Sequence, residues 1–95
     1  MPPRHEPPLF RGDEDLDYIR VMWGARIRRR REKLGLTQTD LARYIGVTQG
    51  EISRIESGER NVADLDRIAL ARVFSCSVRT LFSYEERRED DEGAA

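Results

Sequence analysis

Two predicted helix starts close together in residues 36–58 limit what this chain can fold into more than any other feature of its sequence. Thr37 is followed three residues later by Asp40, and Thr48 is followed by Glu51 in the same way. Both threonines have the form of a helix N-cap, and Thr48 with Glu51 forms a full capping box, in which side chains satisfy the free N–H groups of the first helical turn. The stretch therefore predicts two short, neighbouring helices.

The connection between these two helices is a tight turn. Gly46 stands where the first helix can end in a left-handed residue, so the helices are expected over about 38–45 and 49–57. So short a connection forces the two helices to cross steeply. Apolar residues three and four apart share one side of a helix, and those expected to face inward are Leu41, Ala42, Ile45, Val47, Ile52 and Ile55.

The outer face of the second helix differs from an ordinary solvated face. At about 100° per residue, the side opposite the inward residues carries Gly50, Ser53, Arg54 and Ser57, with Gln49 at its flank. Gln and Arg make bidentate contacts to adenine and guanine, and Gly50 lowers helix propensity by about 1 kcal/mol relative to Ala, a cost that a purely structural helix has no reason to carry. The alternative is a generic helical hairpin, but this outer face favours a helix that lies in the major groove of DNA.

The stretch resembles the helix-turn-helix of the phage-repressor and Cro type, often called the XRE-like family. The residues that match are Gln38, Leu41, Ala42, Gly46, Val47, Ile52, Ile55, Glu56 and Gly58. The resemblance continues on both sides and covers about residues 21–82, most of the chain. It implies an all-α fold, a compact five-helix bundle of the phage-repressor type, in which the third helix is the recognition helix.

The resemblance also implies roles for single residues. Gln38 and the loop after the third helix are expected to hold phosphates, while the third helix is expected to face the bases. Together with the outer face described above, the predicted DNA-binding residues are Gln38, Thr48, Gln49, Gly50, Ser53, Arg54, Ser57, Arg60, Asn61 and Arg31.

Arg31 is a special case among these residues. It shares the apolar helix face of Ile27 and Leu34, so it is expected to point partly inward, where an arginine needs a carboxylate. By resemblance to the family, that partner is Glu56, and the pair would tie the first helix to the third. The guanidinium would also be presented to a phosphate, so we expect Arg31→Met to cost more affinity for DNA than stability of the fold.

The charge of the chain is unevenly distributed. The net charge is −1, but residues 20–60 carry ten Arg or Lys against five Asp or Glu. This local excess of positive charge is what phosphate binding requires. The arginine run in residues 26–33 is too dense for every side chain to face DNA, and most of them are expected to be solvated, with Arg31 the exception.

The two ends of the chain differ in composition from the middle. We expect a disordered, proline-rich and acidic arm over 1–14, the folded domain over 15–84 and a disordered acidic tail over 85–95. The tail is expected to be a solvated terminus, and the alternative is an acidic segment that competes with DNA for the basic surface. A first helix longer than the family usually has is expected, capped by Asp13, Asp15 or Asp17.

The fourth helix is expected over 64–74, capped near Asn61 or Ala63. Its core side is predicted to be formed by Leu65, Ile68, Ala71 and Phe74. Arg67 and Val62 stand where family members usually have leucine and proline, which leaves the rotation of this helix open.

The fifth helix is expected over 78–84 and is more apolar than a terminal helix needs to be for packing alone. By resemblance to the family, it forms the dimer contact, and the alternative is that its side chains close the core of the monomer. The residues concerned are Val78, Leu81, Phe82 and Tyr84.

Other classes of function find no support in the sequence. It shows no Ser/His/Asp set, no metal-ligand spacing and no Gly-rich phosphate loop. Its single histidine, His5, and its single cysteine, Cys76, form neither a metal site nor an internal disulfide. No apolar run reaches the length of a membrane span, and the N-terminus lacks the order of a signal peptide. We therefore expect no enzymatic activity, no cofactor and no membrane association.

The sequence thus predicts a cytoplasmic, nucleoid-associated transcriptional regulator, a repressor that reads double-stranded DNA with its third helix. The expected assembly is a homodimer on a near-palindromic operator. Sixteen arginines against one lysine are typical of a GC-rich bacterial genome. The alternative is an adaptor or antitoxin-type domain that binds a protein partner. Only a DNA reader should lose affinity for duplex DNA steeply as salt rises.

Overall fold

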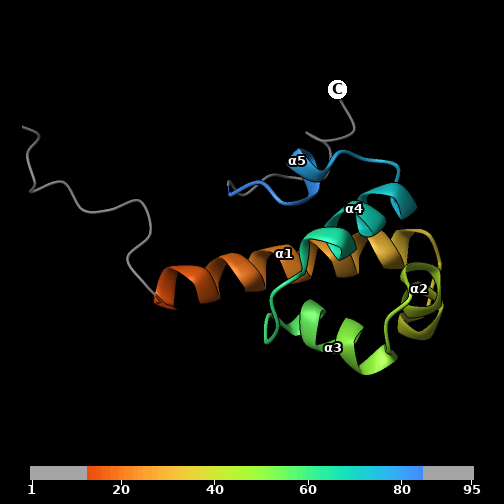
Figure 1. The fold of residues 1–95 in the computed structure, drawn as a ribbon, viewed down its shortest axis with the longest axis horizontal. Helices are drawn as coiled ribbons and strands as arrows, with labels where there is room; N and C mark the ends of the chain where they lie inside the picture. The colour runs from red at the N-terminus through yellow and green to blue at the C-terminus, as the bar shows by residue number, and fades with distance from the viewer. Residues whose placement is uncertain (1–12, 85–95) are drawn as a thin grey trace, which may run out of the picture.

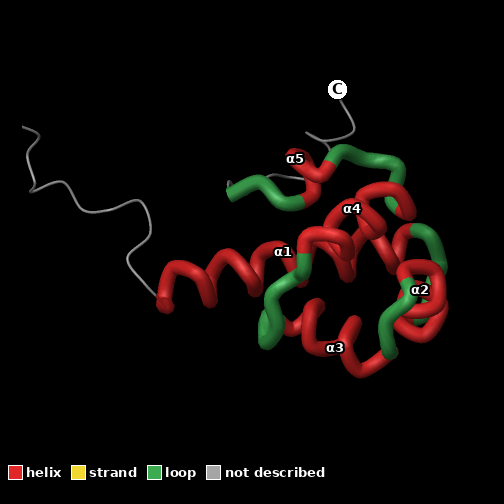
Figure 2. The backbone as a smooth tube through the Cα atoms, in the orientation of Figure 1, coloured by secondary structure: helices red, strands yellow, loops and turns green. Residues whose placement is uncertain are grey.

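The computed structural model describes residues 13–84, with side chains from Leu16 onwards, and this part of the chain forms five α-helices. In chain order the helices are α1 Asp13–Lys33, α2 Gln38–Ile45, α3 Gln49–Ser57, α4 Asp64–Val73 and α5 Val78–Leu81. Residues 13–84 contain no β-strand (Figure 2). The predicted all-α fold with five helices is confirmed.

The long helix α1 packs against α3 and α5 (Figure 1). α3 and α5 both contact α1, α2 contacts α3 and α4, and α4 contacts α5. The N-terminal end of α1 extends past the other helices (Figure 1). The predicted lengthening of the first helix is confirmed, since α1 already begins at Asp13, inside the predicted arm 1–14. The rest of that arm and the predicted tail 85–95 lie outside the described residues.

Both predicted helix starts are formed by reciprocal hydrogen bonds. Thr37 Oγ1 accepts from the N–H of Asp40 at 3.0 Å, and the N–H of Thr37 donates to Asp40 Oδ2 at 2.9 Å. The same two bonds join Thr48 and Glu51 at 3.1 and 2.8 Å. Gly46 ends α2 with φ 79°, in the left-handed region where glycine carries no steric penalty. The sequence therefore fixes both ends of the turn between α2 and α3 locally.

A single apolar core joins all five helices. The side chains that are fully buried are Ile27, Leu41, Ile52, Ile55, Leu70 and Leu81. Burying such a side chain contributes about 1.5–3 kcal/mol. The predicted inward face of α2 and α3 is confirmed, with Ile45 and Val47 partly buried at its edge.

Gly24 allows α1 and α3 to approach each other unusually closely. A Cβ atom at this position would lie 2.4 Å from the carbonyl oxygen of Ile55 and 2.5 Å from that of Glu56. Both distances are far shorter than van der Waals contact, and both partners are backbone atoms that cannot rotate away. The crossing of α1 and α3 therefore depends on the absence of a side chain at Gly24.

The core face predicted for α4 is wrong in part. Leu65 is 78% exposed and Ile68 is 44% exposed, whereas the buried residues around α4 are Leu70, Ala71 and Phe74. The reason is Arg67, whose guanidinium carbon lies 4.6 Å from the centre of the Trp23 ring and 5.3 Å from that of Phe82. A cation–π contact thus replaces the leucine that the family usually has, and the neighbouring apolar residues turn to solvent.

Arg26 corrects a second expectation, since Arg31 is not the only inward-pointing member of the arginine run. Arg26 is 3% exposed, and its Nη1 donates to the carbonyl oxygen of Leu81 at 2.8 Å. Trp23 Nε1 donates to the carbonyl oxygen of Ser83 at 2.9 Å. These bonds attach the segment after α5 to α1. Arg28 and Arg29 are exposed, as predicted for most of the run.

The last two helices are shorter than predicted. α4 ends at Val73, one residue early, and α5 ends at Leu81 because the chain is then held by α1. The N-cap of α4 is Ala63, which has no side-chain cap, and the Asn61 side chain instead accepts from the N–H of Val62. Of the four residues assigned to a dimer contact, Leu81 and Phe82 are buried, and those left exposed are Val78 and Tyr84.

We predict that Gly24→Ala lowers the free energy of unfolding by about 1–3 kcal/mol or more, because the new Cβ overlaps two carbonyl oxygens of α3. Chemical denaturation followed by circular dichroism measures this loss. The matched control is Gly50→Ala, whose Cβ would meet its nearest atoms at 3.7 and 3.9 Å and which should gain up to about 1 kcal/mol of helix propensity. Similar losses in both variants would contradict the close approach of α1 and α3.

Candidate nucleic-acid interface

The outer face of α3 is the exposed side of this helix. Gln49, Arg54 and Ser57 are exposed, while Gly50 and Ser53 are half-buried. The opposite side is closed by the buried residues Ile52, Ile55 and Glu56. The residues predicted on the outer face of α3 therefore all lie on a surface that a ligand can reach, unlike Arg31, which is buried.

Gln49 is held in place by a side chain of the preceding helix. Its Nε2 donates to Oε1 of Gln38 at 2.7 Å, and Nε2 of Gln38 donates in turn to Oε1 of Glu56 at 3.0 Å. Gln38 and Gln49 are the first residues of α2 and α3, so the tight turn brings the two amides together. The sequence did not show this contact, and its only sign was a glutamine directly after each of the two N-caps.

The predicted ion pair between Arg31 and Glu56 is confirmed. Arg31 Nε donates to Glu56 Oε2 at 2.6 Å and Arg31 Nη2 to Glu56 Oε1 at 3.1 Å, and the two side chains are 10% and 3% exposed. Arg31 Nη1 also donates to the carbonyl oxygen of Leu36 at 2.7 Å. The hydrogen bond to Glu56 raises the pKa of Arg31, so the guanidinium stays charged.

Leu34, expected on the same face of the first helix as Arg31, is 54% exposed because α1 ends at Lys33.

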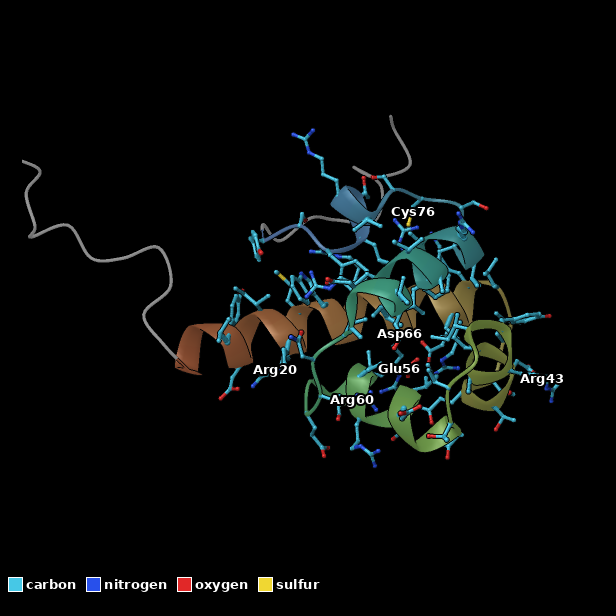
Figure 3. The ribbon with its side chains drawn as sticks, in the orientation of Figure 1. Arg20, Arg43, Glu56, Arg60, Asp66 and Cys76 are labelled. Carbon is cyan, nitrogen blue, oxygen red and sulfur yellow. The ribbon has the colours of Figure 1, made fainter. Side chains whose placement is uncertain are left out.

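These bonds form one continuous polar network from the core to the surface. It runs from Leu36 through Arg31, Glu56 and Gln38 to Gln49. Figure 3 shows Glu56 inside the body of the protein, whereas Arg43 points away from it. The bonds between Arg31 and Glu56 are buried and have few alternative arrangements, whereas the last bond, between Gln38 and Gln49, is exposed. The network thus holds Gln38 from below and gives the amide of Gln49 a partner on the outer face of α3.

Arg54 lies back along α3 over the space left by Gly50. Its Nη1 is 3.7 Å from the position that a Cβ of Gly50 would occupy. The pair is four residues apart and therefore shares one side of the helix. The glycine thus leaves room for the guanidinium near the N-terminal end of α3.

The residues after α3 are partly engaged within the protein. Arg60 Nη1 donates to Glu51 Oε1 at 2.6 Å, and the Ser57 hydroxyl lies 3.1 Å from the carbonyl oxygen of Arg54 and 2.9 Å from Glu59 Oε2. The pKa of Glu51 is lowered by the N–H of Thr48 first and by Arg60 second. Arg60 and Asn61, the predicted phosphate contacts, therefore lie next to the end of α3. Arg60 also neutralises the carboxylate of Glu51 in the first turn of α3.

The match to known proteins covers this same region. The helix-turn-helix family model matches residues 27–81, more than half of the sequence. The chain belongs to the helix-turn-helix family. An HTH-type transcriptional regulator of Archaeoglobus fulgidus is 36% identical to the chain over 61 residues, which are 64% of this chain and 87% of the relative.

Two solved structures resemble the fold over most of its length. The restriction-modification controller protein C.AhdI from Aeromonas hydrophila is 33% identical with a TM-score of 0.63, over 74% of this chain and 100% of that protein. The P22 c2 repressor, solved in complex with a synthetic operator, is 33% identical with a TM-score of 0.63, over 66% of this chain and 96% of the repressor. The predicted phage-repressor type, a class of DNA-binding transcriptional regulators, is confirmed.

Two further observations concern the described residues alone. None of their helices is both long enough and apolar enough to cross a membrane. Within residues 13–84, no group of three or more His, Cys, Asp or Glu side chains is placed to hold a metal ion.

We predict that Arg31→Met lowers the free energy of unfolding by about 3–5 kcal/mol, because it leaves the carboxylate of Glu56 buried with Gln38 as its remaining partner. This expectation reverses the one drawn from the sequence, in which loss of DNA affinity came first. The double variant Arg31→Met/Glu56→Met removes both charges and should recover part of the loss in urea denaturation. A double variant that loses as much as the sum of the single variants would contradict this account.

We predict that the capping carboxylates make the stability fall in acid. The pKa of Glu51 in the folded protein lies below its ordinary value of 4.5, so its contribution is complete above that pH and is lost as the pH falls through the lowered pKa. Glu51→Gln should therefore flatten the acid side of a plot of melting temperature against pH. The control is Glu59→Gln, outside the capping box, which should leave the slope nearly unchanged.

Proposed function

We propose that this DNA-binding transcriptional regulator is a repressor that reads the major groove of double-stranded DNA with the outer face of α3. The observation that carries the proposal is the fixed amide of Gln49, held by Gln38 at the exposed N-terminal end of α3. An amide of this kind makes a bidentate pair with adenine, worth about 1–3 kcal/mol of discrimination. Because the network already holds the side chain, less conformational entropy is lost when the pair forms.

Arg54 is proposed as the second base-reading residue. Its guanidinium is exposed and lies over Gly50, so it can reach a base edge as the helix enters the groove. Arginine pairs with the O6 and N7 atoms of guanine. Ser53 lies between these two contacts on the same face, where a small hydroxyl lets the helix backbone come close to the bases.

The residues around α3 are proposed to hold the DNA backbone. Thr48 and Ser57 mark the two ends of the helix, and Arg60 and Asn61 follow in the next loop. Gln38 and Arg31 belong to the network beneath, so we assign them to positioning first and to phosphate contact second. A phosphate beside Arg60 would compete with Glu51 for its guanidinium.

The assembly and the setting of this function are also proposals. The P22 c2 repressor was solved in complex with a synthetic operator. Two copies of this chain on a near-palindromic site would place their two α3 helices one DNA turn apart in the major groove. Occupation of such a site would block transcription in the cytoplasm, at the nucleoid. We propose no cofactor and no catalytic group for this activity.

One observation favours the alternative of a protein-binding adaptor. An open apolar groove is lined by Leu34, Leu36, Tyr44 and Val73. Affinity for duplex DNA as a function of salt separates the two functions, because a DNA reader follows a slope near −0.9 for each phosphate neutralised. Absence of duplex binding at physiological salt would support the adaptor.

We predict that Gln49→Ala and Arg54→Ala each weaken binding to the preferred operator by about 1–3 kcal/mol and relax the preference at one base pair. Selection of bound fragments from random duplexes gives the operator and its symmetry, and titration of single-base variants gives the preferences. Gln38→Ala should relax the same base pair as Gln49→Ala, because it frees that amide.

The matched control for Arg54→Ala is Arg79→Ala, an exposed arginine on α5. It removes the same charge from a helix that packs on α1 and α4 and should leave base preference unchanged. If every variant lowered affinity equally for all sequences, α3 would position the protein without reading bases.

A further inference from the structure

One side of α1 carries apolar side chains that remain largely exposed. Tyr18 is 54% exposed, Val21 is 52% exposed and Ala25 is exposed, and the stripe ends at Arg28, which pairs with Glu32 at 3.2 Å. Spacings of three and four residues place these four on one side. The core-facing residues Ile19, Trp23 and Ile27 lie on the other side, and Val21 borders the body of the protein at Gly58. We call Tyr18, Val21, Ala25 and Arg28 the α1 stripe.

The charges along α1 are strongly separated. Residues 13–19 contain four Asp or Glu and no Arg or Lys, whereas residues 20–33 contain seven Arg or Lys and one Glu. The N-terminal end that carries the acidic residues extends beyond the other helices (Figure 1). An identical helix laid antiparallel would bring each acidic end against a basic end, so the surface is complementary to itself.

We propose that the α1 stripe is the docking site for a second copy of this chain, with the two α1 helices antiparallel. A two-fold axis at the level of residue 23 places Val21 opposite Ala25 of the second copy and Tyr18 opposite Arg28 of the second copy. Asp17 then faces Arg29 of the second copy, and Ala25 is small enough to let the helices approach. This proposal names the contact surface of the homodimer in the proposed function. Its role on DNA rests on that proposed function.

The predicted dimer contact at α5 lies only partly at the surface. Leu81 is 0% exposed and Phe82 is 6% exposed, so both already serve the core of their own chain, whereas Val78 is 37% and Tyr84 is 59% exposed. A contact made by the α1 stripe alone is small compared with a standard interface, which buries about 1,600 Å² in total. The dimer is therefore weak in free solution and is completed when two copies bind neighbouring half-sites.

Sedimentation equilibrium of the full chain tests the surface. Ala25→Glu should raise the dimer dissociation constant at least about tenfold, because the longer side chain prevents the close approach of the two helices and places a carboxylate in their contact. The matched control is Val78→Glu on α5, which should leave the constant unchanged. Both positions are exposed, and circular dichroism checks that both variants fold. A wild-type chain that stays monomeric up to millimolar concentration, or a dimer broken by Val78→Glu alone, overturns the proposal.

A charge exchange tests the antiparallel register. Asp17→Arg and Arg29→Asp should each weaken the dimer, and the double variant should restore the dissociation constant to within a few fold of the wild type. Both single variants also change charges within α1, where Asp17 pairs with Arg20, but only a contact between copies predicts the rescue. A double variant weaker than either single variant overturns this register.

Binding to DNA separates failure of this proposal from failure of the proposed function. Ala25→Glu should keep the wild-type affinity for a duplex with one half-site and lose about tenfold or more on a duplex with two. Equal affinity of Ala25→Glu and wild type for the two-site duplex overturns the role of the α1 stripe on DNA. A wild-type chain that binds no duplex removes the proposed function, while sedimentation still decides whether α1 pairs.

Discussion

The buried ion pair between Arg31 and Glu56 is the interaction on which the rest of the structure depends. It joins α1 to α3, and its remaining hydrogen-bonding groups reach Leu36 in the turn before α2 and Gln38 at the start of α2. A buried pair of charges adds little net stability, because desolvation offsets most of the attraction. Its value here is geometric, since an apolar pair of the same size would leave nothing to orient Gln38 and, through it, Gln49.

The ion pair can form only because the backbones of α1 and α3 come close together. Gly24 lies against the carbonyl oxygens of Ile55 and Glu56, which places the end of α3 within reach of an arginine two turns further along α1. A second close approach follows at Gly58, where a Cβ would lie 2.6 Å from Val21 Cγ2. Gly58 has φ 84°, so its left-handed conformation also ends α3. Two glycines thus set the position of the end of α3 relative to α1, and both contacts precede Arg31 along α1.

The parts of the fold that the sequence predicted are those determined locally. A capping box acts within four residues, so Thr37 and Thr48 gave both helix starts correctly. The partner of Arg31 lies 25 residues away and was available only through resemblance to a family. The predicted core face of α4 was wrong in part because periodicity counts Arg67 as polar, while its planar cation is stable against the rings of Trp23 and Phe82. Contacts between side chains of different helices, such as the one between the amides of Gln38 and Gln49, leave no periodic pattern in the sequence and so could not be predicted from it.

The polar network beneath the outer face of α3 also limits which substitutions this face can accept. Gln49 receives its position from Gln38 and Glu56, so a new side chain at Gln49 would leave the amide of Gln38 without that partner and shift a group that also contacts the buried carboxylate. Arg54 and Ser53 have no bond of this kind to the network through their side chains among the described contacts. Base preference can therefore change at Arg54 and Ser53 with little effect on the fold, whereas a change at Gln49 also removes a hydrogen-bond partner of Gln38.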